Sequence, residues 1–320
     1  MHEFELIKKY FSNISKKNKP ALDLNDDVFF DKKKGIVVSV DTYNIGTHFF
    51  DFKNPNLVIK KILRSSISDL ICKGVLPKFY FIAGSGNKKT FTKKNLLKIS
   101  KALKEDQKKF NVFLSGGDTT FSKNLTFTIT SLGFSKKIIY RNKVLFNDDI
   151  YVTGNLGDSY VGLQVLKKKI KVSKFFRNYF IKKYYLPEPQ IKLSKKLLNI
   201  ASSSIDVSDG LIADMKKMIN NQKNLSFVIN ERCIPISSPL KRLIKSKKMK
   251  KISLISNGDD YQILFTAGKD KSRIINKLSK VYGIKISKIG KIVSKNKKSI
   301  IVDEKGKQIA LNSNGYVHKF

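Results

Sequence analysis

The sequence predicts an α/β (α+β) protein that is divided into two domains. Runs of β-branched and aromatic residues alternate with helical stretches in both halves of the chain, a pattern typical of this class. A length of 320 residues is sufficient for two domains that each bury a sizeable core. Lysines become dense around residues 134–142, so we place the boundary there and expect domains at 1–139 and 140–320.

The first half begins with an expected helix at residues 3–11, whose apolar residues recur on one face. A β-branched strand at 35–40 follows and ends on Asp41. Gly84 and Gly86 lack the lysine of a P-loop and the third glycine of a dinucleotide fingerprint, so we interpret them as a turn. The other expected elements are a long helix from 54 to 74, a strand at 78–83, a helix at 91–109, and strands at 112–114 and 125–130.

The second half repeats the alternation of strands and helices. A strand at 150–153 turns at Gly154 into a helix that begins near residue 157. The lysines at 167–174 are interpreted as a helix end and a loop, and two prolines at 186–189 interrupt the chain. The other expected elements are helices at 190–200, after 210, at 238–248 and at 270–282, and strands at 202–207, 225–230, 261–266, 285–293 and 298–302.

The net charge of +39 is the most unusual property of the composition. Only six of the 64 basic residues are arginine, whereas proteins that recognise nucleic acids commonly use the bidentate arginine side chain. The lysines are spread over almost every segment, as a bias of an A/T-rich genome would produce on solvated faces. We therefore expect no nucleic-acid partner, although a basic nucleic-acid-binding protein remains the alternative from another class.

The two cysteines and the N-terminal segment both indicate a reducing compartment. Cys72 and Cys233 are far apart in the sequence and lack the spacing of metal ligands, so we expect free thiols. The N-terminal segment is acidic and unlike a signal peptide, and no apolar run is long enough to span a bilayer. We expect a cytoplasmic protein without a membrane partner.

Carboxylates are scarce in this chain, and their placement is informative. Most of them stand at strand ends or helix starts, beside Gly, Ser, Thr or Asn. Each alone is compatible with a helix cap or an Asx-turn, but together they indicate convergence on one cation-rich site. The positions are Asp26, Asp27, Asp41, Asp69, Asp118, Asp206, Asp209, Asp259 and Asp260.

The segment Gly116-Gly117-Asp118 shows this arrangement most clearly. It follows an apolar run at 112–114 that we interpret as a short buried strand. Paired glycines allow a bulky anion to approach the main chain, and an acid at such a turn can ligate a divalent cation. We expect Gly117 to leave room for a nucleotide and Asp118 to hold a metal ion.

The acid pattern favours phosphoryl transfer over other chemistry. Mg²⁺ prefers oxygen ligands and is commonly shared between a few carboxylates and substrate phosphates. Phosphoryl transfer depends mainly on positioning and charge neutralisation, which such a site supplies. No Ser-His-Asp arrangement, histidine metal cluster or cysteine nucleophile motif competes with this interpretation.

Motifs in order over nearly the whole chain resemble those of thiamine-monophosphate kinases, a family related to aminoimidazole ribonucleotide synthetase and selenophosphate synthetase. The Asp-x-Ser-Asp-Gly-Leu-x-x-Asp segment and Gly-Gly-Asp-Thr are specific in combination. The matching segments are Asn25-Asp-Asp27, Ser39-Val-Asp-Thr42 with His48, Ser68-Asp-Leu70, Gly116-Gly-Asp-Thr119, Arg141, Val152-Thr-Gly-Asn-Leu-Gly-Asp-Ser159, Ile205-Asp-Val-Ser-Asp-Gly-Leu211, Asn257-Gly-Asp-Asp-Tyr261 and Gly315-Tyr316.

The resemblance implies ATP-dependent phosphorylation of thiamine monophosphate with several Mg²⁺ ions. It also implies a homodimer, in which the N-terminal domains build a barrel and the C-terminal α/β domain covers the active-site cleft. The implied metal ligands are Asp27, Ser39, Asp41, Asp69, Asp118, Asp206 and Asp209, of which Asp27, Asp118 and Asp206 are the expected catalytic residues. The implied nucleotide contacts are Gly117, Asp118, Arg141 and Ser208, and the implied thiamine contacts are His48, Asp259 and Tyr316.

Two positions depart from the family pattern. Asn25 stands where the family usually has glycine, and asparagine tolerates the left-handed conformation that such a turn requires. Asp259 stands where the family usually has the longer glutamate, which leaves its substrate contact open. The closest alternative function is therefore another ATP-dependent enzyme of the superfamily that uses a different acceptor.

Overall fold

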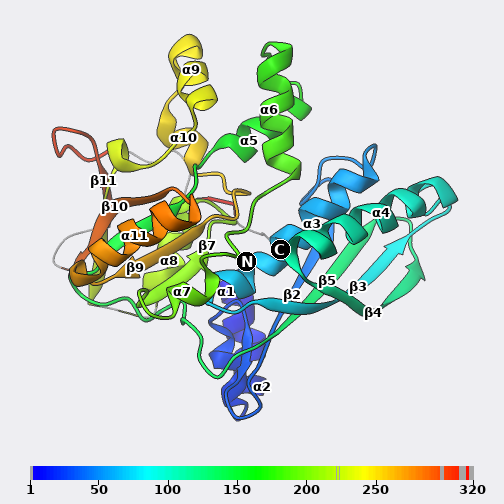
Figure 1. Ribbon diagram of the computed structural model, residues 1–320, viewed down its shortest axis with the longest axis horizontal. Coiled ribbons are helices and arrows are strands. Elements are labelled where there is room, and N and C mark those ends of the chain that lie inside the picture. Colours follow the sequence, from blue (N-terminus) through cyan, green and yellow to red (C-terminus); the bar gives the residue numbers. More distant parts are fainter. Residues whose placement is uncertain (1–2, 221, 223, 296–298, 310–314, 317–320) are drawn as a thin grey trace.

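The computed structural model describes residues 3–220, 222, 224–295, 299–309 and 315–316, which form two β-sheets covered by helices (Figure 1). The α/β class predicted from the sequence is confirmed. The last strand of the first sheet ends at Phe134 and the first strand of the second begins at Asp149, so the boundary at 139/140 stays a prediction within this interval. No helix in the described part of the chain is long and apolar enough to cross a membrane.

The first sheet has five strands in the order β1-β2-β5-β3-β4. The pairs are antiparallel except that β3 and β4 run parallel. One face is covered by α3, which packs on β2 and β5, and by α4 beside it. The strands are β1 (Phe29–Asp31), β2 (Ile36–Asn44), β3 (Pro77–Gly86), β4 (Phe113–Phe121) and β5 (Thr126–Phe134), and the helices are α3 (Pro55–Cys72) and α4 (Lys93–Phe110).

The second sheet has six strands in the order β11-β8-β10-β6-β9-β7. Its strands are β6 (Asp149–Thr153), β7 (Ser203–Asp206), β8 (Leu225–Asn230), β9 (Ile263–Ala267), β10 (Ile286–Ser294) and β11 (Ile300–Val302). Its α-helices are α5 (Asp158–Leu166), α6 (Lys174–Tyr185), α7 (Ser194–Leu197), α8 (Leu211–Ile219), α9 (Ser238–Lys247), α10 (Lys251–Ile255) and α11 (Ser272–Tyr282). Of the predicted strand at 298–302, residue 298 lies outside the described residues.

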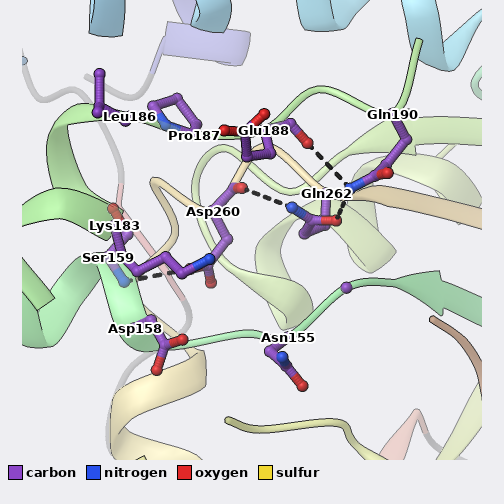
Figure 2. A pocket seen from close by; sticks show the side chains of 11 residues that line it. Asn155, Asp158, Ser159, Lys183, Leu186, Pro187, Glu188, Gln190, Asp260 and Gln262 are labelled. Atoms are coloured by element: carbon purple, nitrogen blue, oxygen red, sulfur yellow. Dashed lines mark hydrogen bonds between the residues drawn. The ribbon is translucent and has the colours of Figure 1, made fainter. Parts of the chain in front are cut away.

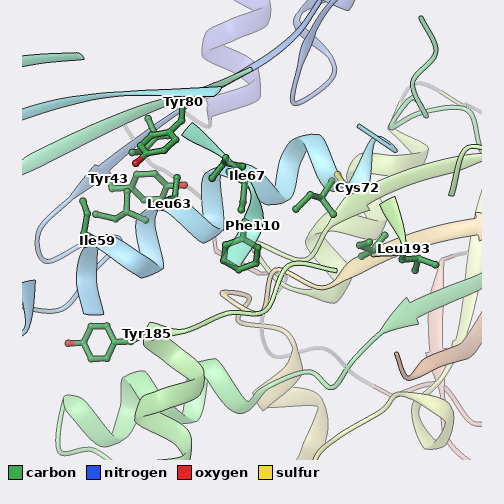
Figure 3. Packing of buried hydrophobic residues seen from close by; sticks show 14 of the residues in the cluster. Tyr43, Ile59, Leu63, Ile67, Cys72, Tyr80, Phe110, Tyr185 and Leu193 are labelled. Atoms are coloured by element: carbon green, nitrogen blue, oxygen red, sulfur yellow. The ribbon is translucent and has the colours of Figure 1, made fainter. Parts of the chain in front are cut away.

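Helix α3 belongs to the packing of both halves (Figure 3). Its residues Ile59, Leu63 and Ile67 are fully buried in one hydrophobic cluster with Tyr80 of the first sheet. The same cluster includes Tyr185 from the end of α6, which belongs to the second half. Because burying each large apolar side chain contributes roughly 1.5–3 kcal/mol, this shared core joins the two halves at α3.

The N-terminal segment is helical for longer than predicted. An α-turn at Glu3–Leu6, a π-helix at Ile7–Phe11 and an α-turn at Ser12–Ser15 follow one another without a break. A 3₁₀ segment at Lys19–Leu24 then leads to the first acids. The helix expected at 3–11 is confirmed and extends by four residues.

Two glycine segments that we interpreted as turns are strands. Gly84 and Gly86 lie within β3, where a Cβ atom at Gly84 would be 3.3 Å from the ring of Phe91. The segment after residue 114 also continues as β4 as far as Phe121. Residues 112–114 were expected to be buried, but Phe113 and Leu114 are about half exposed, because β4 is the edge strand of its sheet.

Four other elements differ from the sequence-based expectation. Helix α6 occupies residues that include part of the lysine cluster, and it buries Phe180, Tyr184 and Tyr185. The helix expected at 190–200 is reduced to α7 with turns on either side. Short elements β1 and α10 were not predicted, since runs of three to five residues carry too little periodicity to be recognised.

Candidate functional site

Three of the predicted metal ligands come together where the two sheets meet, and we call them the acidic cluster (Asp41, Asp69 and Asp206). Asp41 is on the inner face of β2, Asp69 on the last turn of α3, and Asp206 at the end of β7. Asp69 lies within hydrogen-bonding reach of Asp41, and the Ser68 hydroxyl donates to Asp206. The cluster is therefore carried by two strands and one helix that come from both halves of the chain.

In the described residues no ion pair reaches the acidic cluster, and the nearby Lys73 and Lys217 charges offset only part of the effect of burial on Asp69 and Asp206. Burial raises the pKa of Asp41 to about 6 and that of Asp206 to about 8. Burial and the neighbouring Asp41 and Asp206 charges raise the pKa of Asp69 well above its usual range. Carboxylates that crowd in this way accept a divalent cation favourably, because the cation removes their mutual repulsion.

The described residues do not include three acidic, histidine or cysteine side chains arranged to hold one metal ion by themselves. This agrees with Mg²⁺ chemistry, in which a few carboxylates are completed by water and substrate phosphates. Ser39, two residues before Asp41 on the same face of β2, is buried, and its hydroxyl donates to the Ser66 carbonyl at 3.4 Å. The oxygen-rich donor set fits Mg²⁺.

Asp27 lies beside the acidic cluster but is neutralised by the chain itself. The Arg141 guanidinium donates to Asp27 Oδ1 at 2.7 Å, and the Lys73 ammonium lies 3.1 Å from Oδ2. Burial alone would raise the pKa of Asp27, but Arg141 and Lys73 outweigh it and hold the pKa well below its usual range. Lys73 also contacts Asp26 at 2.7 Å. We call Asp26 and Asp27 the anchored pair.

The turn before the anchored pair differs from the expectation at Asn25. Its φ is −119°, so the residue does not adopt the left-handed conformation. Left-handed φ values of 52–56° occur instead at Leu22, Asp23 and Leu24. The Asn25 side chain accepts a hydrogen bond from Arg141 at 3.2 Å, which gives it a role as a partner of that guanidinium.

Asp209 belongs to a separate ion-pair network at the start of α8. Lys217 lies 2.6 Å from Asp209 and 2.9 Å from Asp214, and Asp214 accepts the main-chain N–H groups of Asp209 and Gly210. The N–H of Tyr316 donates to the Asp209 carbonyl at 3.0 Å. The main chain at Tyr316 therefore lies directly beside that of Asp209.

Two of the predicted thiamine contacts meet around Tyr184 of α6. The Tyr184 hydroxyl accepts from the N–H of Phe50 at 3.1 Å and donates to the His48 carbonyl at 3.5 Å. Lys61 of α3 lies 4.1 Å from the Tyr184 ring centre and 2.7 Å from Asp259 Oδ1. The main-chain N–H of Asp259 donates to the Ser208 carbonyl at 2.8 Å, which ties this group to the predicted nucleotide contact.

Asp118 is not part of the acidic cluster within one chain. The register places it in a row with Ala83, Thr128 and Thr42, three strand positions or about 14 Å from β2. This row is on the open face of the first sheet, whereas Asp41 faces α3. The glycine at 117 has a structural cause, because a Cβ atom there would lie 1.8 Å from the Ile82 carbonyl oxygen.

A cavity of about 120 Å³ lies beside Asp260, and none of the predicted metal ligands, nucleotide contacts or thiamine contacts lines it (Figure 2). Its wall includes Ser159 at the start of α5, Lys183 of α6, and Asp260 and Gln262 before β9. Asp260 accepts the N–H of Gly157 at 2.8 Å, and burial raises its pKa to about 8. Asp260, which the sequence grouped with the converging acids, therefore stabilises the start of α5.

Sequence reasoning did not find the buried lysines of these networks. Lys61, Lys73 and Lys217 each neutralise an acid, but lysine is so frequent in this chain that none of them is conspicuous. Only their positions could have identified these lysines, because each lies on or directly after a helix whose neighbouring residues are buried.

Comparison with known proteins identifies the family. Residues 24–135 match the family described as AIR synthase related protein, N-terminal domain. A thiamine-monophosphate kinase of Buchnera aphidicola from Schizaphis graminum is 32% identical over 99% of this chain and 98% of its own length. The chain belongs to the thiamine-monophosphate kinase family. The resemblance stated from the motifs is thereby confirmed, and with it the expectation of a kinase at the level of the family.

The chain is also similar to other proteins of the thiamine-monophosphate kinase family. A kinase of this family from Buchnera aphidicola of Acyrthosiphon pisum is 36% identical over 86% of this chain and 87% of its own length. The solved structure of AaThiL complexed with AMPPCP and TMP superimposes with a TM-score of 0.84 at 23% identity, covering 99% of this chain and 97% of that one. At this identity the superposition establishes the fold.

Proposed function

We propose that the protein phosphorylates thiamine monophosphate to thiamine diphosphate with ATP, by direct in-line transfer assisted by several Mg²⁺ ions. The observation that carries the proposal is the acidic cluster, where three carboxylates from both halves of the chain crowd and no ion pair in the described residues reaches them. Family membership supplies the substrates, since the relatives are thiamine-monophosphate kinases and AaThiL is complexed with AMPPCP and TMP.

The proposed phosphoryl transfer requires the protein mainly to neutralise charge and to position the two substrates. The acceptor is a phosphate oxygen that is already ionised at neutral pH, so no strong general base is needed. Bound Mg²⁺ would relieve the repulsion between the two anionic substrates. Asp41, Asp69 and Asp206 would hold the ions, and Arg141, oriented by Asp27, can direct its remaining N–H groups to a phosphate.

The remaining residue assignments are carried over as proposals. Asp27, Ser39, Asp118 and Asp209 complete the proposed metal ligands, and Gly117 and Ser208 the nucleotide contacts. His48, Asp259 and Tyr316 are the proposed contacts to thiamine. A carboxylate at 259 suits a thiazolium ring, which carries a positive charge.

We also propose that the protein is a homodimer formed by the open face of the first sheet. Val40, Phe81 and Phe134 lie on this face with 61%, 40% and 55% exposure, a large apolar surface for a single chain. A second copy of the sheet would cover it and close a barrel, and it would also bring partner residues close to Asp118. The domains 1–139 and 140–320 and a cytoplasmic location are part of the same proposal.

The decisive experiment is a coupled ADP-release assay with Mg²⁺ and thiamine monophosphate, compared with an aminoimidazole precursor and with selenide. ADP release with thiamine monophosphate alone supports the proposal, and release with another acceptor supports a different enzyme of the superfamily. Turnover of ATP chirally labelled at the γ-phosphate should invert its configuration if the transfer is direct. Absence of ADP release together with salt-sensitive binding of nucleic acid would support the alternative from another class.

A further inference from the structure

Lys61 occupies an unusual position for a lysine. It lies on α3 between the two halves of the chain, and its side chain is only 1% exposed. A buried ammonium is costly unless it is paired and hydrogen-bonded, so its partners are informative.

Among the described residues, the partners of the Lys61 ammonium all come from the second half of the chain. It donates to Asp259 Oδ1 at 2.7 Å and to the Tyr184 carbonyl at 3.3 Å. The ring centres of Tyr184 and Tyr261 lie 4.1 and 5.5 Å away, within the range of cation–π attraction. The ammonium is therefore enclosed by two aromatic rings and one carboxylate.

The contacts of Asp259 are unequal on its two oxygens. Oδ1 accepts from Lys61 and from the Tyr261 hydroxyl, the latter at 3.1 Å. In the described part of the chain no hydrogen bond reaches Oδ2, and the Asp259 side chain remains 24% exposed. The backbone is also constrained, with φ of 65° at Asp259 and 50° at Tyr261. One oxygen is fixed and the other is left for a ligand.

We propose that Lys61 is a positioning residue for substrate recognition: it holds Asp259 by Oδ1 so that Oδ2 is presented to the cationic ring of the acceptor. The proposal rests on the proposed function. It also accounts for the shorter side chain at 259, because a carboxylate clamped by Lys61 and Tyr261 keeps a fixed place although it is one methylene shorter than glutamate.

The test is steady-state kinetics of Lys61→Met, which retains the packed aliphatic stem and removes the ammonium. The KM for thiamine monophosphate should rise about 10-fold or more, while kcat and the KM for ATP change less than about 3-fold. Lys61→Arg should restore much of the loss. Lys61→Met combined with Asp259→Asn should be no worse than Asp259→Asn alone, since both act through one carboxylate.

Lys60→Met is the matched control, because Lys60 is the preceding residue on α3 and pairs with Glu105 instead. An unchanged KM for thiamine monophosphate in folded Lys61→Met overturns the proposal, as does an equal loss in kcat and in both KM values. If Lys61→Met does not fold, Tyr261→Phe removes the other donor to Oδ1, and an unchanged KM in that variant overturns the proposal. Failure of the wild-type protein to release ADP with thiamine monophosphate rejects the proposed function itself.

Discussion

The acidic cluster and the anchored pair are neighbouring groups of buried carboxylates that differ in how their negative charge is compensated. Asp26 and Asp27 are neutralised by Lys73 and Arg141, which the fold itself supplies. In the described residues no ion pair reaches the acidic cluster, and the pKa values of its three carboxylates are raised by burial. The fold therefore neutralises the anchored pair before any ligand binds, whereas no ion pair of the described residues neutralises the acidic cluster.

The largest expected effect is that of Asp69→Asn. It removes the acid that lies next to both other members of the acidic cluster, so activity should fall about 1,000-fold or more because the metal site is incomplete. The melting temperature in EDTA should stay equal or increase, because the neutral amide replaces a carboxyl group whose ionised form is disfavoured by burial and by the neighbouring acids. ADP release and thermal melting measure the two effects, with exposed Asp270→Asn as the control. A large loss of stability in EDTA would contradict the comparison.

Lys73→Met should mainly reduce stability, in contrast to Asp69→Asn, which should mainly reduce activity. Removing the fully buried ammonium leaves Asp26 without its cation, so the free energy of unfolding should fall by about 3 kcal/mol. Most of the loss should remain in the presence of Mg²⁺, because Asp26, which is not among the proposed metal ligands, has lost its cation. Urea denaturation measures it, and Lys88→Met on the exposed surface is the matched control. A loss that Mg²⁺ repairs completely would show that a metal ion can replace Lys73 at Asp26.

Ser68→Ala should weaken the acidic cluster more mildly. The Ser68 hydroxyl donates to Asp206 and orients this carboxylate. Loss of such an orienting group commonly costs about 10-fold in metal affinity, so the Mg²⁺ concentration for half-maximal activity should rise by that factor. Ser246→Ala, which removes a similar hydroxyl from α9, is the control. An unchanged Mg²⁺ requirement would mean that Ser68 has only a structural role.

The smallest expected effect is the pH dependence of stability. The pKa values of Asp41 and Asp206 are about 6 and about 8 in the folded chain, against an ordinary value of 3.8. The folded state therefore binds more protons than the unfolded state between about pH 4 and 8, and stability decreases as the pH rises through this range. In EDTA the melting temperature should be lower at pH 8 than at pH 6, and Mg²⁺ should reduce the difference. A higher melting temperature at pH 8 in EDTA would contradict the electrostatic account.

The convergence of Asp41, Asp69 and Asp206 could be predicted from the sequence, but the partners of the candidate acids could not. Asp206 ends β7, and Asp41 follows the recognisable β-branched run at 35–40, although β2 continues as far as Asn44. Both positions are marked by local sequence patterns. Lys73 is neutralised by acids almost 50 residues away, and a local pattern cannot reveal such a contact. The distance between Asp118 and Asp41 depends on strand order, because β5 and β3 lie between their strands.

The misread glycines have a similar cause. Gly84 and Gly117 were interpreted as turn residues, since glycine permits conformations that other residues avoid. In the fold Gly84 faces the rings of Phe91 and Phe127, and Gly117 faces the main chain of Ile82. Glycine is needed at these positions for lack of space, which depends on tertiary packing.

Helix α3 has a consequence for the size of the acceptor. Lys61 and Asp69 are eight residues apart on this helix, which corresponds to about 12 Å at 1.5 Å per residue. The proposed recognition of the cationic ring occurs at one end of this interval and the proposed metal chemistry at the other. Because α3 is a continuous buried helix, it fixes the distance between these two sites. If both proposals hold, an acceptor must be long enough to reach Asp259 while its phosphate lies at the acidic cluster.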